Sequence, residues 1–273
     1  MNIFGLGSGK TKTFRPKRKR KKVGGGANAV DMEAFSFANL QSDLSKFVVL
    51  PESQCEEEWL AVHCGDFVSL TNILYGTLGQ YCTDDSCPIM SAGPLYEYWW
   101  RDEVKKKAQQ VSAPVYVDSL LDWIEDQMGD EAIFPSPETI ADAAAAALSA
   151  SPSSAAASSS AAPGAPDADS ATKTDADASV HSGSDLSAVT AASAAFPPNF
   201  KGVVRKIFSR LFRVYGHIYH SHLPHIVLLD QERHLNSLFL HLIYFIQEFD
   251  LIDKKELEPL AEVIDRLMSN AQD

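Results

Sequence analysis

The sequence predicts an all-α protein: a helical bundle stapled by a Cys2His2 metal site, with a basic arm before it and a low-complexity insertion inside it. Three observations predict this architecture. Apolar residues recur every three or four positions along most of the chain, which is the period of an amphipathic helix. Two cysteines and a cluster of histidines have metal-ligand spacing, and two long stretches have too little apolar content to fold. We find no run of alternating apolar residues long enough to predict a strand.

The first element is a basic arm over residues 1–30. It holds nine of the 24 Lys and Arg residues and no acidic residue, and it includes the run from Arg15 to Lys22. We expect this arm to be disordered because it cannot form a core. Its charge is typical either of a solvated tail or of a nuclear-import signal.

Two helices are predicted in the first half of the chain. The longer one spans residues 55–78, where Trp59, Phe67 and Leu74 fall on one apolar stripe. The shorter one spans Val115 to Met128. Short links between such helices favour a bundle.

A low-complexity segment then spans residues 139–195. It consists almost entirely of Ala, Ser, Asp, Pro and Thr, and it has no aromatic residue. We expect a disordered insertion, because so little burial cannot offset the ordering entropy, although Ile140 to Leu148 could extend a helix by two turns. Phe134 and Phe196 on either side indicate one interrupted loop. Residues 31–138 and 196–270 are therefore predicted to form a single domain.

Three further helices follow the insertion. One begins after Pro198 and ends before Pro224, since the residue before a proline is pushed out of the helical region. The next, from Gln231 to Phe249, is apolar over much of its surface and is expected to be central. The last runs from Lys254 to Met268 and begins at a good N-cap residue, Asp253.

Charge and composition limit the partners and the compartment. Outside the arm, 15 basic residues face 36 acidic ones, a formal charge of 15 minus 36, or −21. An acidic body of this kind repels nucleic acid and favours a basic protein partner. Four cysteines and no apolar run of about 20 residues predict reduced thiols, no membrane span and a cytoplasmic location, with the nucleus as a second one if the arm acts in import.

Cys82 and Cys87 place two thiols in a polar turn with four residues between them, and several histidines lie at the end of the helix before Pro224. Together they fit a Cys2His2 structural zinc site. Four protein ligands leave no position for an activated water, so the site would hold the fold together and would not catalyse.

Spacing alone leaves the choice of histidines open among His217, His220, His222 and His225. On an ideal helix His217 and His220 share a face, whereas His217 and His222 lie about 140° apart. The second pair converges only if the helix ends between its members. Pro224 favours such an ending.

Four segments resemble the Mob/phocein kinase-activator family. They are residues 80–94 (QYCTDDSCPIMSAGP), 96–98 (YEY), 210–220 (RLFRVYGHIYH) and 249–253 (FDLID). The resemblance covers about residues 32–139 and 196–268. It implies an all-helical bundle whose zinc ligands are Cys82, Cys87, His217 and His222.

The resemblance also implies a non-catalytic co-activator of NDR/LATS-type AGC kinases. In this family an acidic surface of the activator binds the basic segment that precedes the kinase domain of its partner. The matching residues here are Glu58, Trp59 and Asp66, whereas Gln54 replaces a further acid that close members carry. Expected processes are Hippo signalling, mitotic exit and cytokinesis.

Close members of the family bind phosphothreonine segments of upstream Hippo/MST-type kinases as well. Arg210 and Arg213 match the basic residues of that site, and Lys106 and Lys107 could add charge. Ser209 replaces a lysine. The alternative to phosphate binding is that the two arginines simply lie on a solvated helix face. In the arm, Thr13 resembles a phosphorylation site of the family.

Other functions are less favoured. No nucleophile with a base is apparent, and Gly5 to Thr11 lacks the spacing of a phosphate-binding loop, so we expect no enzyme. The acidic body argues against a nucleic-acid-binding zinc protein. Within the family, the alternative is a phocein-like subunit of a phosphatase-kinase scaffold complex.

Overall fold

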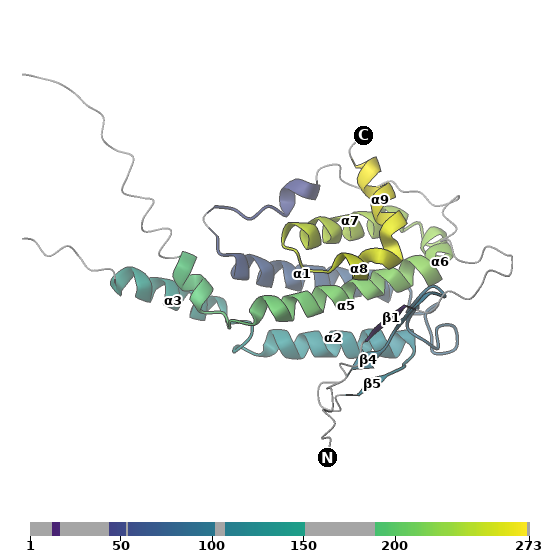
Figure 1. The fold of residues 1–273 in the computed structure, drawn as a ribbon, viewed down its shortest axis with the longest axis horizontal. Helices are drawn as coiled ribbons and strands as arrows, with labels where there is room; N and C mark the ends of the chain where they lie inside the picture. Colours follow the sequence, from purple (N-terminus) through teal and green to yellow (C-terminus); the bar gives the residue numbers. More distant parts are fainter. Residues whose placement is uncertain (1–12, 17–43, 53, 102–106, 151–188, 272–273) are drawn as a thin grey trace, which may run out of the picture.

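The computed structural model describes residues 13–16, 44–52, 54–101, 107–150 and 189–271 (Figure 1). Four helices form the body of the bundle. They are α1 (Glu56–Gly76), α2 (Ala113–Gly129), α5 (Phe200–Ser221) and α7 (Glu232–Glu248). The all-α class is confirmed, and the bounds of these helices lie close to the predicted ones.

The helix α5 lies at the centre of the bundle. Every residue from Leu211 to Tyr219 is buried, whereas α7 keeps exposed residues at both ends. On one side α5 meets α1, where the Thr71 and Tyr215 hydroxyls lie 3.2 Å apart. The α7 helix is largely buried, as predicted, but α5 rather than α7 is the most enclosed helix of the described residues.

Aromatic side chains fill the space between these helices. Phe67 of α1 packs edge-on against Phe208 of α5, with ring centroids 5.5 Å apart, and Phe208 stacks on Phe245 of α7 at 5.3 Å. Such contacts bury large apolar surfaces that stabilise the fold by about 25 cal/mol per Å². They join α1, α5 and α7 into one core, which fixes the position of the end of α5.

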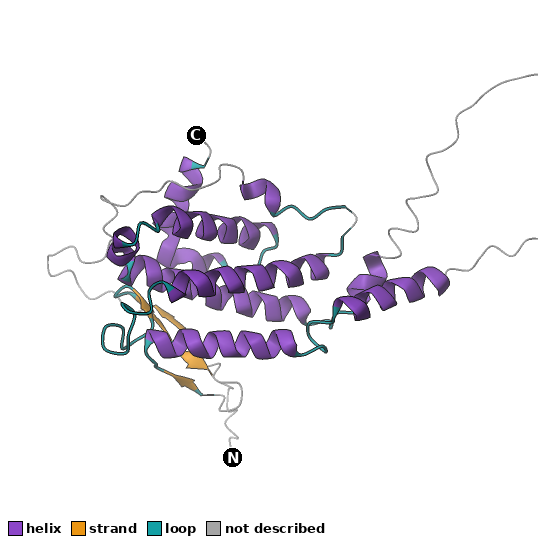
Figure 2. Cartoon of the chain, turned by 180° about the vertical axis from the view of Figure 1, so that it is seen from behind, coloured by secondary structure: helices purple, strands orange, loops and turns teal. Residues whose placement is uncertain are grey.

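In the part of the chain that the structure describes, short strands lie at one end of the bundle (Figure 2). β1 (Phe14–Pro16), β3 (Tyr96–Tyr98) and β2 (Ser91–Ala92) form an antiparallel sheet in the order β1-β3-β2, and β4 (Trp100–Arg101) pairs with β5 (Ala108–Gln109). None of these strands was predicted, because strands of two or three residues show no alternation of apolar and polar residues. The expectation that the whole arm is disordered is wrong at β1.

The insertion is shorter than predicted on its N-terminal side. The Ala-rich stretch forms α3 (Pro137–Ala150), a helix of 14 residues where two turns were expected. Residues 189–194 are helical as well. The part between them, residues 151–188, lies outside the described residues.

The C-terminal region differs from the single predicted helix. It is divided into α8 (Lys254–Leu257), the 3-10 turn η2 (Glu258–Leu260) and α9 (Ala261–Asn270). The break lies at Pro259, which has no N–H to donate. Asp253 occupies the N-cap position of α8, but its side chain makes no capping hydrogen bond.

Two short elements were not predicted. The 3-10 turn η1 (Leu44–Phe47) precedes α1, and α6 (Leu223–Leu228) follows α5 directly. None of the described helices combines the length and apolar character that a bilayer crossing requires.

Candidate metal centre and docking surfaces

The end of α5 supplies two of the four candidate ligands. The helix stops at Ser221, so His222 is its C-cap residue and His217 lies in the turn before it. Pro224, in the first turn of α6, accompanies the change of direction. The helix therefore ends where it must end for the His217 and His222 imidazoles to converge.

The loop after α1 supplies the two thiols. Its turn is closed by hydrogen bonds from the Cys87 N–H to the Thr83 carbonyl (2.8 Å) and from the Ser86 hydroxyl to the Tyr81 carbonyl (2.7 Å). Cys82 and Cys87 are both buried. The turn directs both sulfur atoms toward the end of α5.

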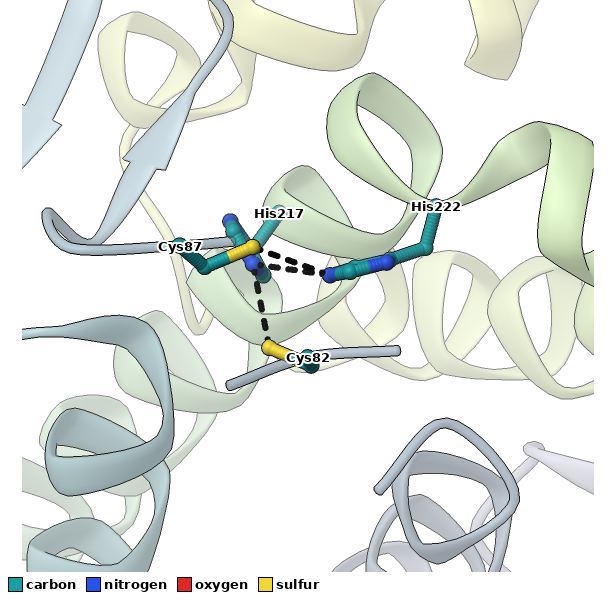
Figure 3. A group of neighbouring side chains, drawn as sticks. All are labelled: Cys82, Cys87, His217 and His222. Atoms are coloured by element: carbon teal, nitrogen blue, oxygen red, sulfur yellow. Dashed lines mark hydrogen bonds between the residues drawn. The ribbon is translucent and has the colours of Figure 1, made fainter. Parts of the chain in front are cut away.

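The four side chains meet at one point (Figure 3). Their ligand atoms all lie within 4.8 Å of one another. Cys82 Sγ is 3.5 Å from His217 Nε2, Cys87 Sγ is 3.4 Å from His222 Nε2, and the two Nε2 atoms are 3.2 Å apart. In a zinc tetrahedron with Zn–N near 2.0 Å and Zn–S near 2.3 Å, neighbouring ligands lie roughly 3.3 to 3.8 Å apart. The donor set fits Zn²⁺, and these three distances lie near that range.

Other residues orient the imidazoles. His217 Nδ1 lies 2.9 Å from the Ser91 carbonyl oxygen, and His222 Nδ1 lies 3.4 Å from His225 Nδ1. A metal at Nε2 would keep the proton on Nδ1, and His217 would then donate to the Ser91 carbonyl oxygen and His222 to His225 Nδ1. His225 is in turn stacked on Tyr81 at 4.3 Å. The spacing of the cysteines and histidines in the sequence did not indicate that the Ser91 carbonyl would orient His217.

Burial sets the protonation of the free ligands. It lowers the pKa of His217 and that of His222, the latter to about 4, so both imidazoles are neutral at pH 7. Burial raises the pKa of the Cys82 thiol to about 12, and the Tyr75 hydroxyl donates to its sulfur at 3.2 Å. A bound Zn²⁺ would replace the thiol proton and stabilise the thiolate.

His220, the other candidate on α5, turns away from this centre. Its Nε2 lies 3.0 Å from the Pro259 carbonyl oxygen. Its ring also lies against Gly93, whose φ of +62° is a left-handed conformation that suits glycine. His220 therefore packs the C-terminal region onto α5.

Comparison of the whole chain with known proteins leads to the same family that the segments around this centre resemble. The Mob1/phocein family model matches residues 38–147 and 183–260. The chain belongs to the Mob1/phocein family. Among its relatives, "MOB kinase activator-like 1 homolog A" of Dictyostelium discoideum is 42% identical over 272 residues, which is 99% of this chain and 100% of the relative. "MOB kinase activator-like 1A" of Arabidopsis thaliana is 42% identical over 271 residues, 98% of this chain and 99% of the relative.

The residues expected to contact a kinase lie on α1 of this Mob1/phocein chain. Glu58 and Trp59 are half-buried in its first turns, and Asp66 is exposed two turns later. The Trp59 ring meets the His63 ring at 4.4 Å, and its Nε1 donates to the Val48 carbonyl oxygen at 3.4 Å. The three side chains thus belong to one helix, with the indole held against the body.

The acidic residues in the first turn of α1 differ in whether another residue of the chain pairs with them. Glu56 forms an ion pair with Lys201 of α5. Its charge is therefore partly neutralised within the chain, which weakens its attraction for a basic partner. Glu57 and Glu58, in the same turn, add negative charge at the positive end of the α1 dipole, where it is favourable.

The residues expected to bind phosphothreonine are less accessible than the sequence indicated. The Arg210 guanidinium lies 4.5 Å from the Trp100 ring centroid and 4.1 Å from that of Trp123. Arg213 is buried, with only 6% of its surface exposed. Lys107 is exposed, and Lys106 lies outside the described residues. The alternative of two solvated arginines does not describe Arg213.

Thr13, the candidate phosphorylation site, is half-exposed at the start of β1. Its hydroxyl accepts a hydrogen bond from Arg213 Nη1 at 3.2 Å. No pattern in the sequence indicates that these two residues, 200 positions apart, are in contact.

Proposed function

We propose that this protein is a non-catalytic adaptor that binds the basic N-terminal regulatory segment of an NDR/LATS-type Ser/Thr kinase and supports its activation. Membership of the Mob1/phocein family and relatives named as kinase activators support a role as kinase co-activator. The observation that carries the finer proposal is the exposed face of α1, where acidic and apolar side chains alternate.

This face is made of residues three or four positions apart. Glu58, Val62, Asp66, Leu70 and Ile73 fall on one side of an α-helix. Val62 is 59% exposed and Ile73 is 68% exposed, although both are large and apolar. A surface of this kind suits an amphipathic basic helix, because its apolar residues anchor the partner and its acids select the charge.

Binding at this face is tested by calorimetric titration with the basic segment that precedes such a kinase domain. Glu58→Lys combined with Asp66→Lys should weaken binding at least tenfold, and the wild-type affinity should fall with added salt. The matched control is Asp118→Lys with Asp122→Lys, which reverses two exposed acids one turn apart on α2. Equal affinities for both double variants would place the contact elsewhere.

We also propose that Arg213, together with Arg210 on the same helix and the exposed Lys107, docks phosphothreonine segments of an upstream Hippo/MST-type kinase. Arg213 supports this because guanidinium groups bind phosphate through paired, charge-assisted hydrogen bonds. A phosphothreonine peptide should bind more tightly than its unphosphorylated form. Equal binding of the two forms would refute the docking.

A further inference from the structure

Two half-buried histidines lie beside the exposed acidic and apolar face of α1. His63 is on α1, four residues after Trp59 and three before Asp66, so it shares their side of the helix. His241 is on α7, which lies alongside α1 (Figure 1), and the two histidine ring centroids are 6.5 Å apart with the rings edge to face. The pair therefore bridges α1 and α7 next to residues proposed to contact the kinase segment.

Aromatic rings surround the rest of the pair. The His63 ring centroid lies 4.4 Å from that of Trp59 and 5.0 Å from that of Phe245, and the His241 centroid lies 4.8 Å from that of Phe67. The buried His241 Nε2 atom has no hydrogen-bond partner among the described residues. Such surroundings favour neutral imidazoles, so the pair takes up a proton only in acid.

Asp66 is the charged side chain that favours this proton. Burial lowers the pKa of His63 and Asp66 raises it, whereas burial and His63 lower the pKa of His241, which Asp66 raises. Among the described residues, neither α5 nor η1 contributes a charged group to these shifts. Two positive charges 6.5 Å apart repel each other, so the pair takes up one proton before a second. The first proton is therefore bound below about pH 6.5, close to Asp66.

We propose that His63 and His241 form a proton switch on the α1 face, in which uptake of one proton weakens binding of the basic kinase segment. The proposal rests on the docking function proposed above. The proton adds a positive charge beside Asp66 and so offsets part of the negative charge that attracts the segment. Histidine is the side chain that ordinarily changes charge between about pH 5 and pH 8, so these two residues make the face sensitive to pH in that range.

The switch works in both directions, because coupling between two binding events is reciprocal. If one proton weakens binding of the basic segment, the bound segment must lower the proton affinity of the pair by the same factor. Binding of the segment should therefore shift the titration of His63 and His241 to lower pH. This shift can be measured in the wild-type protein by NMR of the histidine ring protons.

The binding test is calorimetric titration of the zinc-loaded, full-length protein with the basic segment that precedes an NDR/LATS-type kinase domain, at pH 7.5 and at pH 5.5. In wild type, Kd should rise about threefold to tenfold between the two pH values. In the double variant His63→Gln/His241→Gln, the rise should be less than about twofold, because no proton is taken up beside Asp66. The matched control is His234→Gln, which removes an exposed histidine near the start of α7 and should keep the wild-type rise.

The control separates the switch from effects of acid on zinc binding or folding, because all three proteins share the same metal centre. Equal changes in Kd in the three proteins, or a histidine titration that the bound segment leaves unshifted, would overturn the switch and leave docking at the α1 face intact. The NMR titration uses wild-type protein, so it decides the question even where the double variant is destabilised. No binding of the segment by any of the proteins at pH 7.5 would remove the docking function and the switch with it.

Discussion

Replacing one metal ligand should remove the contribution of zinc to stability. In Cys82→Ser the hydroxyl takes the place of a buried sulfur that lies 3.5 Å from His217 Nε2. A structural zinc site is formed only in the folded state, so metal binding adds directly to the free energy of unfolding. At free zinc about a thousand times Kd, this addition is about 4.1 kcal/mol.

The predicted change in melting temperature follows from that figure. For a domain of this size, 1 kcal/mol corresponds to roughly 2 to 4 °C. The wild-type Tm should therefore be about 8 to 16 °C higher in buffered zinc than in a chelator. In Cys82→Ser and in His217→Ala this difference should fall to nearly zero.

Cys64→Ser is the matched control for these variants. Cys64 is fully buried on α1 and takes no part in the centre, and burial raises its thiol pKa to about 12. This change should lower Tm in both conditions and leave the difference between zinc and chelator unchanged. A difference that persists in Cys82→Ser and His217→Ala would refute the metal site.

Three further predictions concern the support of the centre, the core and the response to pH. His225→Phe keeps an aromatic ring against Tyr81 but removes the hydrogen-bond acceptor for His222. The zinc affinity, measured by competition with a chelator, should therefore fall about 10- to 100-fold. An unchanged affinity would show that His225 does not orient His222. Phe239→Ala removes a buried ring that contacts three aromatic residues of α5, and denaturant unfolding should show a loss of about 3 to 5 kcal/mol, whereas a loss below 1 kcal/mol would contradict the packing. Burial lowers the pKa of His63 and of His241 below 6.5, so below that pH the unfolded chain binds more protons than the folded one. Their contribution to stability is full above about pH 6.5 and is lost as pH falls further, so His241→Gln should flatten the decline in urea midpoint between pH 7 and pH 5, and an unchanged decline would assign it to other groups.

Much of the fold follows from patterns that are local in the sequence. The apolar period of α1 and α5 predicts both helices, since one buried stripe every 3.6 residues is a property of the segment itself. Pro224 predicts the end of α5 through local sterics, and this ending brings His222 toward His217. The metal cluster could therefore be predicted, although spacing left His220 open until the resemblance was considered.

What could not be predicted depends on contacts between distant segments. β1 and β3 are too short for an alternating pattern, and each is stabilised by its partner and by Phe14 packing on Tyr96. The burial of Arg213 has the same origin, because its guanidinium contacts Thr13, Tyr98 and Tyr116, all of which lie far from it in the sequence. Helix periodicity places Arg213 on a face of α5 but cannot say what lies on that face.

The most direct test of the proposed function is the activity of a purified NDR/LATS-type kinase with and without this protein, loaded with zinc, at low and at physiological salt. We expect wild type and Asp118→Lys/Asp122→Lys to raise the kinase activity, Glu58→Lys/Asp66→Lys to leave it unchanged, and added salt to weaken the activation. Equal activation by both double variants, or no activation by any form, would contradict the claim that the α1 face supports an NDR/LATS-type kinase.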